Sequence, residues 1–297
     1  MQNQTRIIIE NVKPQLDGGD FFIKRIINQE VNITADVFSD GHDVIECCVK
    51  YKHETEKIWS EVRMKHIEND EWNAFFKVTN QGFYYYLIEG WVDYALNWQH
   101  GTERKIKDNQ HVKSELLEGA EYCNAILKIV TKEEKMFLQK ALKSFQDENL
   151  YNDAIEFALS NELNNIFKKY PTRTLANTSK ELKVYVDRKK ALFSTWYEFF
   201  PRSASETPGK HGTFKDCLRL LPRIQDMGFD TLYFPPIHPI GEINRKGKNN
   251  ATVALNTDVG SPWGIGSKHG GHKATHPDLG TIQEFKSLVK KAHSMGI

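Results

Sequence analysis

Cysteine, long apolar runs and an excess of charge of either sign are all scarce in this sequence. The four cysteines, Cys47, Cys48, Cys123 and Cys217, have a spacing that fits neither a zinc ribbon nor a secreted disulfide framework. Apolar runs are far shorter than the ~20 residues that cross a bilayer. The first residues also lack the basic and apolar regions of a signal peptide. We therefore expect no membrane partner and a reducing, cytoplasmic location.

Charge is almost balanced over the 297 residues. Lys and Arg number 40 and Asp and Glu number 39, which leaves a net charge of +1. Such a chain has no general attraction for nucleic acid, so we expect no nucleic-acid partner and any basic site must be local. Apolar residues (39%) suffice for a sizeable core. The length allows about two domains of ~100–200 residues or one large barrel.

Residues 5 to about 98 show the pattern of a β domain. Short runs rich in β-branched and aromatic residues alternate with turn signals, and Val31–Val37 has the apolar–polar alternation of a half-buried strand. The last of these runs extends to Tyr94. This pattern predicts an immunoglobulin-like β-sandwich over residues 1–105. The many aromatics are interpreted as sandwich core, with a sugar-stacking face as the alternative.

The hydrophobic period becomes helical after Gly101. Three helices are expected within residues 111–180, and Thr131 and Glu134 have the spacing of a capping box. Alternation returns in a strand over residues 181–188, so we expect the helical segment to be inserted into the sandwich, which this strand completes. The charged outer faces of the helices are either solvated or bind a partner, including a second copy of the chain.

A third pattern occupies residues 190–297. Apolar strands are expected at residues 192–200 and 229–237. Helices are expected at 214–227 and 282–292, and each begins at a threonine cap, Thr213 and Thr281. Strand, helix, strand, long loop and helix is the beginning of a parallel α/β system. The long loop, residues 238–280, follows the carboxyl end of a strand, where such folds place their sites.

Two features of this loop suggest chemistry. Asn244–Asn250 carries three cations around a glycine, which suits a phosphate or a sugar phosphate; the alternative is a solvated basic turn. His269, His272 and His276, with Asp278 nearby, have a possible zinc-ligand spacing. Loop hydrogen bonding is the favoured interpretation of these histidines, so no metal site is assigned.

Several motifs of this region resemble those of the bacterial α-1,4-glucan:maltose-1-phosphate maltosyltransferases, which belong to the α-amylase clan (glycoside hydrolase family 13). The resemblance runs nearly continuously from about residue 190 to 297. The motifs that carry it are Ser194–Ser203, His211–Phe214, Met227–Gly241, Arg245–Asn250, Gly260–Ser267 and Gly271–Thr281.

The resemblance implies a retaining transfer of maltosyl from α-maltose 1-phosphate to the non-reducing end of an α-1,4-glucan, with release of phosphate. It implies no metal and no organic cofactor, and a homodimer to which the helical insert contributes. The family's donor-site lysine and asparagine correspond to Lys246 and Asn250, which are expected to contact the maltosyl unit.

Retention needs two carboxyl groups about 5–5.5 Å apart. The family carries its nucleophilic Asp and its acid/base Glu on the fourth and fifth strands of a (β/α)₈ barrel, whereas residues 190–297 correspond to its first two βα units. We therefore expect a truncated barrel, no catalytic residue within this chain, both carboxylates beyond residue 297, and an inactive fragment. Glu198 and Glu242 are not assigned to either role.

Two other functions stay open. One is a hydrolase or branching enzyme of the same clan, against which the cationic segment Arg245–Asn250 argues, because phosphate-free substrates need no such cluster. The other is a non-catalytic glycan-binding or assembly fragment that uses the sandwich and the helices alone.

Overall fold

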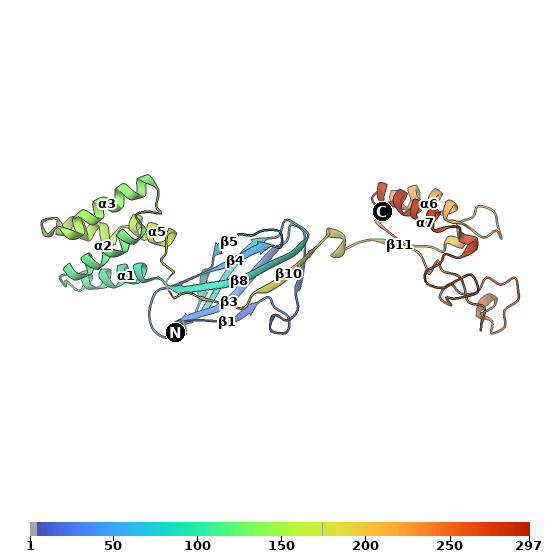
Figure 1. The fold of residues 1–297 in the computed structure, drawn as a ribbon, viewed down its shortest axis with the longest axis horizontal. Coiled ribbons are helices and arrows are strands. Elements are labelled where there is room, and N and C mark those ends of the chain that lie inside the picture. Colours follow the sequence, from blue (N-terminus) through green and yellow to red (C-terminus); the bar gives the residue numbers. More distant parts are fainter. Residues whose placement is uncertain (1–4, 174) are drawn as a thin grey trace. The chain divides into compact units, whose positions relative to one another are not determined.

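The computed structural model describes residues 5–173 and 175–297. The chain forms two compact units, Met1–Lys189 and Lys190–Ile297, and each is described by itself. Figure 1 shows the strands and helices of both units. No helix in the described ranges is long and apolar enough to cross a membrane.

Two sheets make up the β part of the first unit. The four-stranded sheet has the order β1-β3-β7-β6, and the other has the order β2-β10-β8-β4-β5, with β9 also paired to β8. All pairings are antiparallel except that of β2 with β10. The strands are β1 (Ile7–Lys13), β2 (Ile23–Ile26), β3 (Glu30–Ser39), β4 (Ile45–His53), β5 (Ser60–Arg63), β6 (Lys65–Glu68), β7 (Glu71–Lys77), β8 (Gly82–Val92), β9 (Asn177–Thr178) and β10 (Leu182–Asp187).

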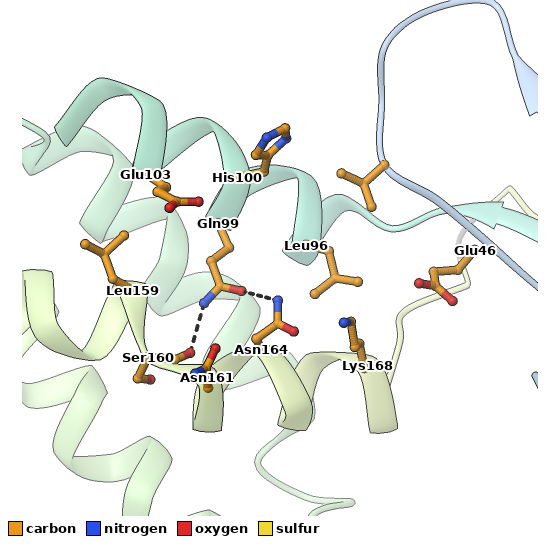
Figure 2. A pocket seen from close by; sticks show the side chains of 11 residues that line it. Glu46, Leu96, Gln99, His100, Glu103, Leu159, Ser160, Asn161, Asn164 and Lys168 are labelled. Atoms are coloured by element: carbon orange, nitrogen blue, oxygen red, sulfur yellow. Dashed lines mark hydrogen bonds between the residues drawn. The ribbon is translucent and has the colours of Figure 1, made fainter. Parts of the chain in front are cut away.

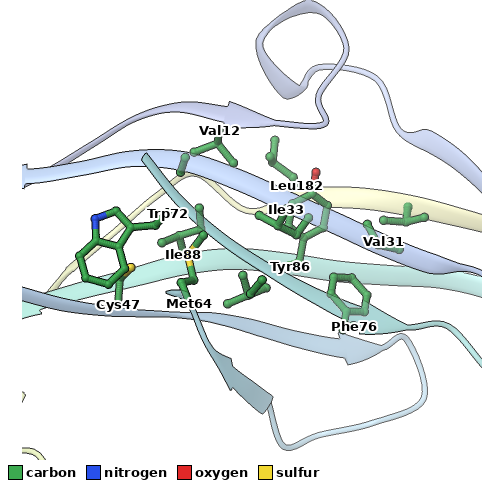
Figure 3. Close-up of a cluster of buried hydrophobic side chains, with 14 of the residues drawn as sticks. Val12, Val31, Ile33, Cys47, Met64, Trp72, Phe76, Tyr86, Ile88 and Leu182 are labelled. Atoms are coloured by element: carbon green, nitrogen blue, oxygen red, sulfur yellow. The ribbon is translucent and has the colours of Figure 1, made fainter. Parts of the chain in front are cut away.

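Both sheets contribute to one apolar core. The alternation expected in Val31–Val37 is confirmed, because Val31, Ile33, Ala35 and Val37 of β3 are buried while the polar residue between each pair is more exposed. From the other sheet, Tyr86 and Ile88 of β8 pack into the same cluster (Figure 3). The interpretation of the aromatics as sandwich core holds for Trp72, Phe76, Tyr84 and Tyr86, whereas Phe21, Phe22 and Phe75 are exposed.

In the described part of the first unit, five α-helices lie in sequence between β8 and β9, and Figure 1 shows this helical module. Thr131 caps its helix in the expected capping box, with both reciprocal hydrogen bonds to Glu134 present. The third expected helix is two helices, because the Ser160 hydroxyl accepts a hydrogen bond from the Leu163 amide and starts a new one. The helices are α1 (Tyr94–Lys107), α2 (Lys113–Ile126), α3 (Lys132–Gln146), α4 (Tyr151–Leu159) and α5 (Asn161–Lys169).

Residues 94–105, which the sequence pattern assigns to the β-sandwich, instead form most of α1. Strand β8 ends at Val92, and the Asp93 carboxylate accepts a hydrogen bond from the Leu96 amide at 3.1 Å. Leu96 and Trp98 then turn into the helical core, where the Trp98 ring approaches α2 at Gly119. The strand ends at this aspartate cap. Apolar composition alone does not reveal such a cap.

The helices are connected to the sheet on both sides. α1 follows β8, and after α5 the chain returns to pair β9 with β8 and to place β10 between β8 and β2. Arg173 in the return segment donates hydrogen bonds to Glu61 and Glu89, and its guanidinium lies 4.3 Å from the ring centre of the buried Trp91. This ion network ties the return segment to β5 and β8.

The second unit has two parallel strands and two helices. β11 (Trp196–Glu198) pairs with β12 (Thr231–Tyr233), α6 (Phe214–Asp226) connects them, and α7 (Ile282–Ser294) packs beside α6. The strands are shorter than the apolar runs at 192–200 and 229–237 suggest, because only three residues of each are paired. Both helices begin with the expected threonine caps, in each case a complete capping box.

Candidate functional site

A long loop between β12 and α7 carries the candidate site. It follows the carboxyl end of β12. The segment after β11 begins at the same edge of the sheet, because the two strands are parallel. Ligand sites of parallel α/β proteins form at this edge. Two cavities of about 380 and 290 Å³ lie among these loop residues.

Arg245 organises the loop. Its guanidinium donates hydrogen bonds to the carbonyl oxygens of Gly241 (2.9 Å) and Asp258 (3.1 Å), and also to that of Ile240. Gly260 lies directly against this side chain: its φ is +71°, and an added Cβ would lie 3.0 Å from the Arg245 Cγ. The sequence places Arg245 among the cations of a possible phosphate site. In the structure its N–H donors instead hold the loop backbone.

Lys246 is placed differently from its neighbour. It is exposed and lines the 380 Å³ cavity together with Asn244, Ser261 and Gly266. A lysine ammonium is a flexible point charge with three donors.

Asn250 is not among the residues that line this cavity. It is exposed, has a φ of +62°, and ends the single helical turn Lys248–Asn250. This turn is closed by hydrogen bonds between Ala251 and Lys248 and between Gly247 and Ala251. The structure therefore brings one of the two expected substrate-binding residues to a cavity and places the other in the adjacent turn.

The histidines are paired in a way that their spacing does not predict. The ring of His276 stacks on that of His211, with the ring centres 5.7 Å apart, and His272 instead lies against His238. Burial lowers the pKa of His276, and the nearby His211 and Arg245 lower it further, while Asp278 opposes the change. Imidazole nitrogens of His211 and His276 and a carboxylate oxygen of Asp278 lie within 4.8 Å of one another.

The sequence pattern assigns no site role to His211, which it includes only in a family motif, or to Asp258. His211 comes from the segment after β11, 65 residues before His276, so no local spacing connects them. Asp258 is 7% exposed; one of its carboxylate oxygens accepts a hydrogen bond from the Leu255 amide, and the other is buried without a partner among the described residues. An isolated aspartate in a polar loop gives no signal of such burial.

Another cavity, of about 410 Å³, lies in the first unit between β4, α1 and α5 (Figure 2). Two of its polar side chains bond to each other, because Gln99 accepts a hydrogen bond from Asn164, and Gln99 also donates to the Ser160 backbone carbonyl. Burial raises the pKa of Glu46 at one end of this cavity. These amides stabilise the helix contacts, so we place the candidate site in the loops of the second unit.

The chain thus combines an N-terminal pair of sheets and a helical module with a parallel strand pair whose long loop lines two cavities. Comparison with known proteins is more specific. Residues 5–188 match the family model described as "Alpha-1,4-glucan:maltose-1-phosphate maltosyltransferase, domain N/S". The chain therefore belongs to the α-1,4-glucan:maltose-1-phosphate maltosyltransferase family.

Curated relatives with this name match almost the whole chain. The protein from Chlorobaculum tepidum is 44% identical over 293 residues, which are 98% of this chain and 44% of the relative. The protein from Methylacidiphilum infernorum is 42% identical over 299 residues (100% and 44%), and that from Myxococcus xanthus is 42% identical over 301 residues (98% and 45%). The chain thus spans less than half the length of these relatives.

Proposed function

We propose that this chain is the N-terminal part of a maltosyltransferase that moves maltosyl from α-maltose 1-phosphate to the non-reducing end of α-1,4-glucans with retention. The observation that carries the proposal is the 44% identity over 293 residues to a protein of that name, which includes the loop where Lys246 lines a cavity. Lys246 and Asn250 would contact the maltosyl unit of the donor. The proposed transfer uses no organic cofactor and no metal ion.

In this proposal the reacting carboxylates lie outside residues 1–297. Retention requires a nucleophile and an acid/base about 5–5.5 Å apart. The second unit would supply the first two βα units of a (β/α)₈ barrel, and the Asp and Glu would come from later strands. The parallel pairing of β11 with β12 through α6 supports this assignment. The two sheets that share one core support an immunoglobulin-like sandwich in the first unit.

We also propose a cytoplasmic homodimer formed through the helical module. Exposed apolar side chains on that module support the dimer: Leu117, Ile129 and Met136 are 46–61% exposed. Four buried cysteines that form no disulfide suit a reducing compartment.

The test measures phosphate release from α-maltose 1-phosphate in the presence of a glucan acceptor. The gene product extended to the length of the relatives is expected to release phosphate, and residues 1–297 alone are not. In the extended protein Lys246→Ala is expected to raise the donor KM about 10–100-fold, the value of a hydrogen bond to a charged group, with a smaller effect on kcat.

Lys268→Ala, an exposed lysine of the same loop, is the matched control and is expected to leave the donor KM unchanged. Turnover by residues 1–297, or unchanged donor kinetics in Lys246→Ala, would contradict the proposal.

A further inference from the structure

The cluster of His211, His276 and Asp278 has the composition of a transition-metal site. Imidazole and carboxylate are ligands that zinc accepts, and three protein ligands plus water complete a tetrahedral set. The three side chains come from two separate segments, one after β11 and one just before α7. We propose that they bind one divalent ion of the zinc class and that this ion cross-links the two segments.

One ion can reach all three ligands after modest side-chain adjustment. Two ligand atoms of a tetrahedral zinc with ~2.1 Å bonds lie about 3.4 Å apart. The three ligand atoms already lie within 4.8 Å of one another, so each pair needs to approach by at most about 1.4 Å. Asp278 is exposed and the two histidines are partly exposed, which leaves room for side-chain adjustment.

A second observation concerns the orientation of His211. Its Nδ1 lies 2.8 Å from the Gly212 carbonyl oxygen, which can only accept, so Nδ1 carries the proton. The lone pair is therefore on Nε2. A ring nitrogen that donates to a backbone carbonyl while the other faces the ion is the usual arrangement of metal-binding histidines. At His276, Nδ1 accepts a long bond of 3.3 Å from the Asp278 amide, which an ion displaces at small cost.

The surroundings supply both signs of charge. All three ligands line the 290 Å³ cavity, which leaves an open position for water. Glu242 and Asp258 line it too, and the unpartnered oxygen of Asp258 favours a cation. Arg245 and His269 oppose a cation, but the Arg245 guanidinium is held by backbone carbonyls.

The other cluster of suitable residues in the described ranges, Cys48, Glu61 and Glu89, is occupied differently. Arg173 donates to both carboxylates at 2.7–2.8 Å, so its guanidinium already takes the place of a cation. We therefore assign the ion to the histidine cluster alone. The sequence gives His272 and His276 only a possible zinc-ligand spacing and assigns no metal site; in the fold, His211 rather than His272 groups with His276.

Calorimetric titration of the full 297-residue chain with Zn²⁺ tests the proposal, with Co²⁺ as a spectroscopic probe. We expect one ion per chain, the visible absorption of tetrahedral Co²⁺, and a higher melting temperature with Zn²⁺. Asp278→Asn and His276→Ala are each expected to weaken Zn²⁺ binding at least about tenfold. Asp278→Asn changes an exposed side chain, so it retains the fold even if His276→Ala does not.

His272→Ala and Cys48→Ser are the matched controls, and both are expected to leave the affinity and the stoichiometry unchanged. Absence of saturable binding overturns the proposal. So does binding that Asp278→Asn leaves intact, or that either control weakens as strongly. The readout is metal binding, which does not depend on maltosyl transfer.

Discussion

The two units of the chain hold their backbones in place by different means. The first is built around two apolar clusters and continuous strand pairing, and its partly buried Arg173 binds two carboxylates. In the second, a single small cluster lies under the helices, and the long loop is held by side chains that bond to backbone atoms, above all Arg245. In this loop Arg245 holds backbone carbonyls, while the neighbouring Lys246 is exposed at a cavity.

The largest effect is expected from removing an apolar side chain of the first unit. Phe167 is 1% exposed and packs edge-on to Trp98, so Phe167→Ala should lower the free energy of unfolding by about 3–5 kcal/mol. Phe75→Ala, at a side chain 56% exposed, should change it by less than about 0.5 kcal/mol. Urea unfolding followed by circular dichroism measures both, and equal losses would show that the apolar cluster is not what stabilises this unit.

A smaller effect is expected from Arg173→Met, which keeps the length of the side chain but removes its charge. The free energy of unfolding at neutral pH should fall by about 2 kcal/mol, because Glu89 loses a charged hydrogen-bond partner at a partly buried position. Arg188→Met, at an exposed arginine, should have little effect.

The same variant should change the response to acid. The hydrogen bond from Arg173 lowers the pKa of Glu61 below its usual value of 4.5. A lowered pKa in the folded state contributes stability above the usual pKa, and this stability is lost as the pH falls through the folded value. The unmodified chain should therefore lose more stability than Arg173→Met when the pH falls below about 4.5. Parallel stability curves for the two proteins would exclude this role.

The smallest effect is expected in the loop of the second unit. A Cβ on Gly247 would lie 2.3 Å from the Val253 carbonyl oxygen, although the φ of −82° suits any residue. Gly247→Ala should therefore cost about 1–2 kcal/mol, since the loop backbone must move. An added Cβ on Gly271 meets nothing within 4 Å, so Gly271→Ala should be nearly neutral. If the two variants have the same free energy of unfolding, the close backbone contacts of the loop contribute nothing to stability.

Local signals predicted much of the fold. The capping boxes at Thr131 and Thr281 and the alternation in β3 are each encoded within a few residues. The short strands β5 and β6 were not predicted, because their mostly exposed residues show no apolar alternation. The start of α1 was missed because it depends on one cap at Asp93.

In the candidate site, too, some features follow from the local sequence and others depend on contacts between distant segments. The placement of Lys246 beside a cavity agrees with its position in a loop after a strand. The contact of His211 with His276 joins segments far apart in sequence, and the use of Arg245 for backbone carbonyls depends on the path of the loop. Spacing along the chain cannot report either contact.

The position of β10 has a consequence for synthesis of the chain. Among the residues that the structure describes, the one strand that pairs with β2 is β10, which follows the whole helical module. As the chain leaves the ribosome, residues 23–26 must therefore wait, without a sheet partner, until residues 182–187 emerge. The helices, whose contacts are local, are free to form in the meantime. The pairing of β2 with β10 can therefore form only after the whole helical module has been synthesised.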